Sequence, residues 1–131
     1  MTQSTTVLVV DDNVDCLALA TRMLEGHGFE VLAADSGANA LEVLETQTPD
    51  VVLLDIMMPG MTGFQLLARI RESAKHYALP VIMLTASNND DDVMTAYQDG
   101  SDYYITKPFT AQQLQYGIDM VLGRDAIAAA K

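Results

Sequence analysis

The sequence VVLLDIMMPGMTG occupies residues 51–63 and combines two features that bear on the fold. Four apolar residues, 51–54, run without interruption to Asp55, and a helical pattern begins beyond Pro59–Gly60. A continuous apolar run is typical of a strand that is buried on both faces, as in a parallel sheet covered by helices on either side. We therefore expect Asp55 at the carboxyl end of a central strand.

Two more apolar runs end in the same way, at polar residues. Residues 7–10 (VLVV) stop at Asp11 and Asp12, and residues 81–84 (VIML) stop at Thr85. Two further runs, 29–33 (FEVLA) and 103–105 (YYI), mix polar and apolar residues. The uninterrupted runs are therefore predicted as central strands and the mixed runs as edge strands.

Apolar residues recur at helical spacing after each of these runs. The predicted inward faces are Val14, Leu17, Ala18, Thr21 and Leu24; Ala40, Leu41 and Leu44; Leu66, Leu67 and Ile70; Val93, Ala96 and Tyr97; and Leu114, Ile118, Val121 and Leu122. Ser36, Thr62 and Thr110 are expected to cap the second, third and last of these helices. Strand and helix thus alternate five times. This predicts a flavodoxin-like (βα)5 domain of the α/β class, with a five-stranded parallel sheet of order 2-1-3-4-5 and helices on both faces.

Composition limits the organisation of the chain, which has 131 residues, 18 acids, 7 bases and a formal charge of −11. This length predicts one domain, residues 1–125, with residues 126–131 as a tail or the start of a linker. The single cysteine, Cys16, excludes an internal disulfide framework, and no apolar run has the length of a membrane span, about 20 residues. Excess acid argues against nucleic acid binding, because phosphate contacts are made mainly by Lys and Arg. Since residues 1–6 do not resemble a secretion signal, a cytoplasmic location is expected.

The polar residues that follow the strands are expected to meet, since the carboxyl ends of parallel strands lie at one edge of the sheet. They are Asp11 and Asp12 after the first strand, Asp55 after the third, Thr85 after the fourth and Lys107 just beyond the fifth. Three grouped carboxylates repel one another, so at neutral pH they need a cation or a raised pKa. Mg²⁺ is the natural ion, because it takes carboxylate, water and phosphate oxygens. Lys107 and Thr85 can then contact a phosphate, and Asp55 is the candidate nucleophile for an aspartyl phosphate.

Four stretches together carry a family resemblance: residues 7–13 (VLVVDDN), 51–63 (VVLLDIMMPGMTG), 81–86 (VIMLTA) and 100–109 (GSDYYITKPF). In this order and at these separations they resemble the receiver domain of two-component response regulators, and the resemblance covers essentially the whole chain. It implies that Asp55 accepts a phosphoryl group from a phosphohistidine on a sensor histidine kinase or a histidine phosphotransfer protein. It also implies a downstream protein effector, and a phosphorylation-dependent homodimer is compatible with it.

The resemblance assigns roles to individual residues as well. It implies a Mg²⁺ site, with Mn²⁺ as a plausible substitute, formed by Asp11, Asp12, Asp55 and the backbone carbonyl of Met57. Lys107 and Thr85 would contact the phosphoryl group, Thr85 and Tyr104 would form the switch, and the bond before Pro108 would be cis. The domain would catalyse its own phosphorylation and dephosphorylation at Asp55 while acting primarily as a signalling switch.

Two alternatives stay open at this point. A Mg²⁺-dependent phosphohydrolase that works through an aspartyl phosphate usually has a D-x-D nucleophile pattern and a separate substrate cap. Here Asp55 is followed by Ile56–Met57, and the chain has no insertion for a cap. A non-phosphorylated scaffold with the receiver fold is disfavoured because every site residue is present. Two histidines, His27 and His76, are expected at the surface, and Asp90–Asp92 as a solvated helix start.

Overall fold

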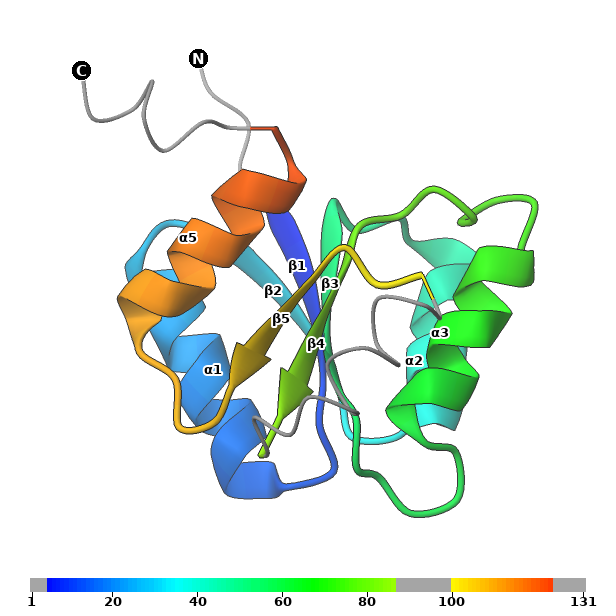
Figure 1. Ribbon diagram of the computed structural model, residues 1–131, viewed down its shortest axis with the longest axis horizontal. Helices are drawn as coiled ribbons and strands as arrows, with labels where there is room; N and C mark the ends of the chain where they lie inside the picture. Colours follow the sequence, from blue (N-terminus) through cyan, green and yellow to red (C-terminus); the bar gives the residue numbers. More distant parts are fainter. Residues whose placement is uncertain (1–4, 87–99, 124–131) are drawn as a thin grey trace.

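The computed structural model describes residues 5–86 and 100–123, and the elements within them follow the predicted alternation (Figure 1). The strands are β1 (Thr6–Val10), β2 (Glu30–Ala34), β3 (Val51–Asp55), β4 (Val81–Thr85) and β5 (Tyr103–Thr106). The helices are α1 (Val14–Gly26), α2 (Gly37–Thr46), α3 (Gly63–Glu72) and α5 (Ala111–Val121). The helix predicted around residues 90–98, the acids at 90–92 and the tail at 126–131 lie outside the described residues.

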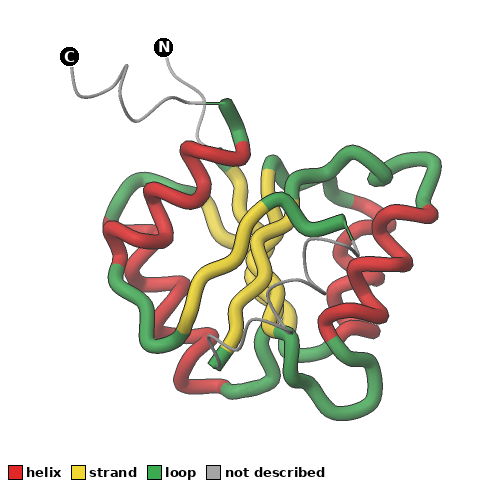
Figure 2. The backbone as a smooth tube through the Cα atoms, viewed as in Figure 1, coloured by secondary structure: helices red, strands yellow, loops and turns green. Residues whose placement is uncertain are grey.

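The sheet has the predicted topology. All five strands are parallel and their order is β2-β1-β3-β4-β5, which confirms the fold class. The central strands come from the uninterrupted apolar runs, and every residue of β3 and β4 is buried. The mixed runs form β2 and β5 at the edges, where part of each strand stays accessible. In Figure 2 the strands form one twisted layer between two layers of helices.

Helices α1 and α5 cover one face of the sheet, and α2 and α3 cover the other (Figure 1). Side chains alternate along each strand, so β1 directs Leu8 toward α2 and α3, and Val7 and Val9 toward α1 and α5. Each face of the sheet therefore has its own apolar core, and the central strands pack between the two cores. Among the described residues, no helix combines the length and the apolar character that a membrane crossing requires.

Three helices begin at the caps that the sequence predicts. Ser36 accepts a hydrogen bond from the backbone N–H of Asn39, and Thr62 and Thr110 each form a reciprocal capping box with the glutamine three residues later. These caps satisfy N–H groups that the first helical turn leaves without a partner. They fix the points at which the chain leaves the carboxyl edge of the sheet.

Two predictions about burial are wrong. In α1, Val14 is 72% exposed and Ala18 is also exposed, whereas Leu24 is buried as expected. The first turn of α1 extends past the ends of the strands (Figure 1), so Val14 has no sheet to pack against. The second error concerns His76, which is buried, with its Nε2 2.8 Å from the Leu44 carbonyl oxygen. The connection between α3 and β4 covers the last turn of α2, whose carbonyls lack helical partners.

Candidate functional site

Three carboxylates meet at the carboxyl edge of the sheet. Asp11 and Asp12 follow β1, and Asp55 ends β3, the strand beside β1. One oxygen from each of the three lies within 4.8 Å of the others. Asp11 and Asp55 are buried, at 1% and 5% exposure, whereas Asp12 is exposed. Two acids are therefore held inside the sheet edge and one lies at its surface.

Asp11 is held through both of its carboxylate oxygens. Its Oδ1 accepts a hydrogen bond of 2.9 Å from the backbone N–H of Asn13, and its Oδ2 accepts one of 2.8 Å from Lys107 Nζ. The Asn13 side chain in turn caps α1 by accepting from the Cys16 N–H at 3.0 Å. The reasoning from strand ends missed Asn13, although an asparagine directly before a helical pattern is a recognised capping signal.

Lys107 reaches into the cluster from the loop after β5. Besides its contact with Asp11, its Nζ lies 3.5 Å from Asp55 Oδ1. Its backbone N–H donates to the Thr85 carbonyl at the end of β4, with an N–O distance of 2.7 Å. The Lys107–Pro108 peptide bond is cis. The structure thus places one ammonium within reach of two buried carboxylates.

Burial and crowding shift the ionisation of the site. The pKa of Asp55 is raised from 3.8 to about 6, first by burial and then by the neighbouring charge of Asp11. Lys107 and the N–H of Met57, which lies 3.3 Å from Asp55 Oδ1, oppose that rise. Burial lowers the pKa of Lys107, but the hydrogen bond to Asp11 and the charge of Asp55 outweigh it, so this pKa is raised. The carboxylates thus carry more negative charge than one ammonium balances.

The start of α3 holds the loop after Asp55 in place. The Gly63 N–H donates to the Ile56 carbonyl at 2.9 Å. A Cβ atom at position 63 would overlap the Asp55 carbonyl oxygen and lie 2.8 Å from the Ile56 Cα, so a side chain does not fit there. Gly63 therefore lets α3 approach the strand end and contact the backbone of Asp55 and Ile56. Its sequence signal is a glycine directly after the capping Thr62, which apolar periodicity does not reveal.

Thr85 and Tyr104 lie on neighbouring strands beside the cluster. Thr85 is the buried last residue of β4 and pairs with Thr106, while Tyr104 pairs with Met83. Because side chains alternate along a strand, Thr85 and Tyr104 lie on the same face of the sheet. The Tyr104 ring is partly buried against the core beneath α2 and α3, and its centroid lies 6.1 Å from that of Tyr103.

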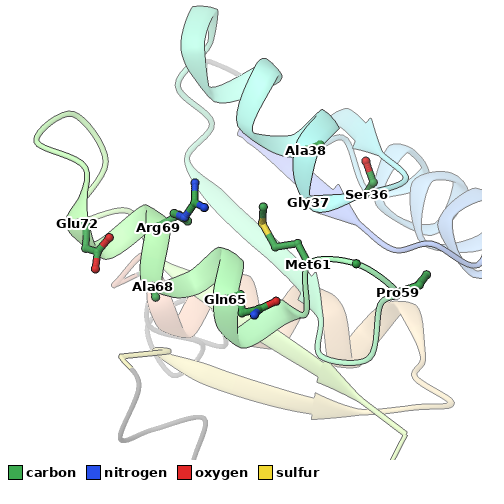
Figure 3. Close-up of a pocket in the computed structure, with 10 residues that line it drawn as sticks. Ser36, Gly37, Ala38, Pro59, Met61, Gln65, Ala68, Arg69 and Glu72 are labelled. Atoms are coloured by element: carbon green, nitrogen blue, oxygen red, sulfur yellow. The ribbon is translucent and has the colours of Figure 1, made fainter.

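A cavity of about 710 Å³ between α2 and α3 lies outside this cluster (Figure 3). It is bounded by residues 36–38 at the start of α2, by the loop at residues 59–61 and by one side of α3. In Figure 3 the Met61 side chain projects between the two helices, and Arg69 extends toward the same gap. None of the three clustered carboxylates lines this cavity, so the cavity is separate from the carboxylate cluster.

The chain is similar to known proteins over most of its length. The family model described as the response regulator receiver domain matches residues 7–119. The heme response regulator HssR of Staphylococcus saprophyticus is 40% identical over 120 residues, which are 92% of this chain and 52% of HssR. Protein PilH of Pseudomonas aeruginosa is 37% identical over 116 residues, which are 88% of this chain and 96% of PilH.

Solved structures agree with these matches. The chemotaxis protein CheY4 of Vibrio cholerae has a TM-score of 0.87 at 28% identity, covering 92% of this chain and 100% of that one. The receiver domain of the Francisella response regulator 1452 has a TM-score of 0.84 at 30% identity, covering 92% and 98%.

The fold and the site together define a class of α/β domains in which grouped carboxylates and a lysine lie at the switch point of a 2-1-3-4-5 sheet. This chain belongs to the response regulator receiver domain family. It spans about half the length of HssR and of several other curated relatives, and nearly all of PilH.

Proposed function

We propose that this chain is the phosphoacceptor of a two-component or phosphorelay system, and that Asp55 takes the phosphoryl group from a phosphohistidine. The observation that carries the proposal is the surroundings of Asp55: an ammonium 3.5 Å away and two further acids alongside. Phosphoryl transfer asks mainly for positioning and for stabilisation of charge, and these groups offer both. Membership of the receiver family supports the same assignment. The donor would be a sensor histidine kinase or a histidine phosphotransfer protein.

The donor set suits Mg²⁺, with Mn²⁺ as a substitute. Asp11, Asp12 and Asp55 offer hard carboxylate oxygens, and the Met57 carbonyl, two residues after Asp55, would add another oxygen. Asp12 is exposed and can turn onto an ion without loss of packing. The pKa of Asp55 is raised first by burial and then by the charge of Asp11, and a bound cation would offset both effects. When bound, Mg²⁺ would neutralise that charge and polarise the oxygens of an incoming phosphoryl group.

In the transfer, an oxygen of the Asp55 carboxylate attacks the phosphorus of the phosphohistidine. A P–O bond forms while the P–N bond breaks, and the imidazole nitrogen leaves with that electron pair and takes up a proton. Lys107 pairs with a phosphoryl oxygen, and the Thr85 hydroxyl donates a hydrogen bond to another. Later attack of water on the phosphorus releases phosphate and restores the carboxylate. The chain thereby assists its own phosphorylation and dephosphorylation.

The phosphoryl group would act as a switch through Thr85 and Tyr104. Drawing Thr85 toward the phosphate opens space on the face of the sheet that it shares with Tyr104, and the Tyr104 ring turns into that space. The surface around β5 and α5 changes as a result, and a downstream protein effector reads the change. A phosphorylation-dependent homodimer would use the same surface. Structures with and without a phosphoryl mimic in which both side chains keep their positions would contradict this switch.

The central claim is tested by incubating the chain with Mg²⁺ and acetyl phosphate and recording the intact mass. We expect the mass of one added phosphoryl group, stable in acid and labile in base, on the wild type and not on Asp55→Asn. Asp119→Asn, which removes an acid of α5 outside the cluster, should be labelled like the wild type. An equal adduct on Asp55→Asn would overturn the assignment. Absence of any adduct would favour a scaffold role, and turnover of added phosphomonoesters would favour a phosphohydrolase.

A further inference from the structure

A groove of about 670 Å³ runs between β5 and α5, on the side of α5 that bears Tyr116. Three tyrosines, Tyr103, Tyr104 and Tyr116, line it together with threonine, glutamine and isoleucine side chains. Tyr116 is 46% exposed, and Met120 lies one turn further along α5 at 48% exposure. Apolar and aromatic surface is thus left open along this side of the helix.

The Tyr103 ring lies next to both of the other tyrosine rings of the groove. The Tyr103 ring centroid lies 6.1 Å from that of Tyr104, with the planes 36° apart, and 6.5 Å from that of Tyr116, with the planes 59° apart. The tyrosines of β5 and α5 can meet because α5 lies close to β5 at Gly117. A Cβ at this position would lie 3.1 Å from Ile105 and 3.2 Å from Tyr103. Burial and then the neighbouring phenols of Tyr116 and Tyr104 raise the pKa of Tyr103.

None of the described residues that line the groove carries a formal charge at neutral pH. They are tyrosine, threonine, glutamine and isoleucine residues, in a chain with 18 acids and 7 bases. A charged side chain brought into such a groove would lose water without gaining an opposite charge, which is unfavourable. Charge matching therefore points to an uncharged occupant.

We propose that this groove binds an uncharged, proline-rich extended segment of a partner protein. Three tyrosine rings line the groove, and recognition of proline-rich segments commonly uses aromatic-lined grooves. The polyproline II backbone makes no internal hydrogen bonds, so its carbonyls need donors. Gln112, on the rim, makes no side-chain hydrogen bond to other parts of residues 5–86 and 100–123 and can donate its amide. A helical segment, whose backbone carbonyls are already paired, would offer this amide no main-chain acceptor.

This inference deepens the proposed function, because it names the chemistry of the protein that reads the β5–α5 surface. It rests on the proposed function only for control by phosphorylation, since the groove is present in the structure without a phosphoryl group. Binding can therefore be measured on the unphosphorylated chain. If either phosphorylation of Asp55 or peptide binding is not observed, the other result can still be interpreted.

The probe is an end-blocked octaproline peptide added to the complete chain, followed by intrinsic tyrosine fluorescence and by backbone amide chemical shifts. The chain has five tyrosines, of which three line the groove, and no tryptophan, so no indole masks the tyrosine emission. We expect weak saturable binding, with shifts confined to β5 and α5. Affinity should change little between about 50 mM and about 500 mM salt, because no ion pair forms.

Tyr116→Ala should weaken octaproline binding about tenfold or more, as expected for an aromatic anchor that the peptide would cover. Tyr77→Ala is the matched control, since Tyr77 is 64% exposed in the connection between α3 and β4, outside the groove. Gln112→Glu tests the rim with little effect on folding, because the side chain is exposed on the first turn of α5. It should also weaken binding.

Three outcomes would overturn the proposal. The first is no saturable response up to about 5 mM peptide, a concentration at which even a very weak site would begin to fill. The second is binding that Tyr116→Ala and Gln112→Glu leave unchanged. The third is tighter binding of an uncharged helical peptide, or a dimer that Tyr116→Ala dissociates, which would assign the groove to a helix or to a second copy. Phosphorylation of Asp55 without octaproline binding would reject this inference alone, and the reverse would reject the phosphoacceptor role alone.

Discussion

The Lys107 ammonium lies 2.8 Å from Asp11 Oδ2, closer than the 3.5 Å that separates it from Asp55 Oδ1. Lys107 is thus paired mainly with the more deeply buried acid and not with the candidate nucleophile. Asp11 sets the position of the ammonium, and its charge also contributes to the raised pKa of Asp55. The pKa of Asp55 therefore depends on both Asp11 and Lys107, and this dependence can be measured.

Replacing Asp11 by asparagine should lower the pKa of Asp55 from about 6 toward its ordinary value of 3.8, because the neighbouring negative charge is removed. Carbon-13 chemical shifts of the Asp55 carboxyl group, recorded over a pH series without metal, measure this directly. Asp35→Asn, at the surface before α2, serves as a matched change of net charge. A pKa of Asp55 that stays near 6 in Asp11→Asn would show that burial alone causes the rise.

Without metal, Asp55 should make the fold less stable as pH rises from about 4 to about 6. A carboxyl group whose folded pKa exceeds its unfolded value binds more protons in the folded state, so the unfolding free energy falls across that interval. Asp55→Asn removes this penalty and should be more stable than wild type at pH 7 by about 2 to 3 kcal/mol, with no gain below pH 4. Urea unfolding in EDTA at both pH values measures the difference. An equal or lower stability of Asp55→Asn at pH 7 would refute the prediction.

Mg²⁺ should stabilise the chain at neutral pH, because the proposed site would bind it only in the folded chain, where the carboxylates are grouped. At a concentration one hundred times its dissociation constant, the expected gain is about 2.7 kcal/mol, and EDTA should reverse it. Asp12→Ala removes an exposed ligand and should abolish most of the gain while leaving the metal-free stability nearly unchanged. Thermal unfolding with and without Mg²⁺ is sufficient, and an undiminished gain in Asp12→Ala would exclude this residue from the metal site.

Gly63→Ala should impair the site more than its small size suggests. The added methyl group would overlap the Asp55 carbonyl and push α3 away from the strand end. We expect loss of the Mg²⁺ response and of phosphorylation by acetyl phosphate, together with a destabilisation of about 2 kcal/mol from overpacking. Gly26→Ala is the control, because a Cβ there meets nothing within 4 Å, and it should be neutral or slightly stabilising. Normal Mg²⁺ binding by Gly63→Ala would contradict the positioning role.

Arg71→Lys should destabilise the chain although it keeps the charge. The Arg71 guanidinium donates to the Gly100 carbonyl from both Nε and Nη2, to the Leu79 carbonyl at 2.6 Å and to Asp102 at 3.0 Å. A lysine ammonium cannot reproduce this fork, so we expect a loss of about 2 kcal/mol in urea unfolding. Arg69→Lys, on the exposed side of the same helix, should change stability by less than about 0.5 kcal/mol. Equal losses of stability in Arg71→Lys and Arg69→Lys would contradict a stabilising role of the Arg71 hydrogen bonds.

The fold could be read from the sequence because its signals are local or follow from simple geometry. Uninterrupted apolar runs at residues 51–54 and 81–84 identify strands covered on both faces, and their burial differs from that of the mixed runs at the edges. Parallel strands end at one edge, so the grouping of Asp11, Asp12 and Asp55 also follows from the sequence.

The remaining features depend on how segments distant in the chain approach one another. The preference of Lys107 for Asp11 joins residues 96 positions apart and depends on fractions of an ångström. The burial of His76 depends on where the connection after α3 crosses the end of α2, and the exposure of Val14 on how far α1 extends beyond the sheet. Periodicity in the sequence shows which side of an element is apolar, because that property is local. Only tertiary packing decides how each helix is rotated, how far it extends beyond the sheet and how far apart two side chains lie. These features determine the charge balance around Asp55 and the tyrosine groove beside α5.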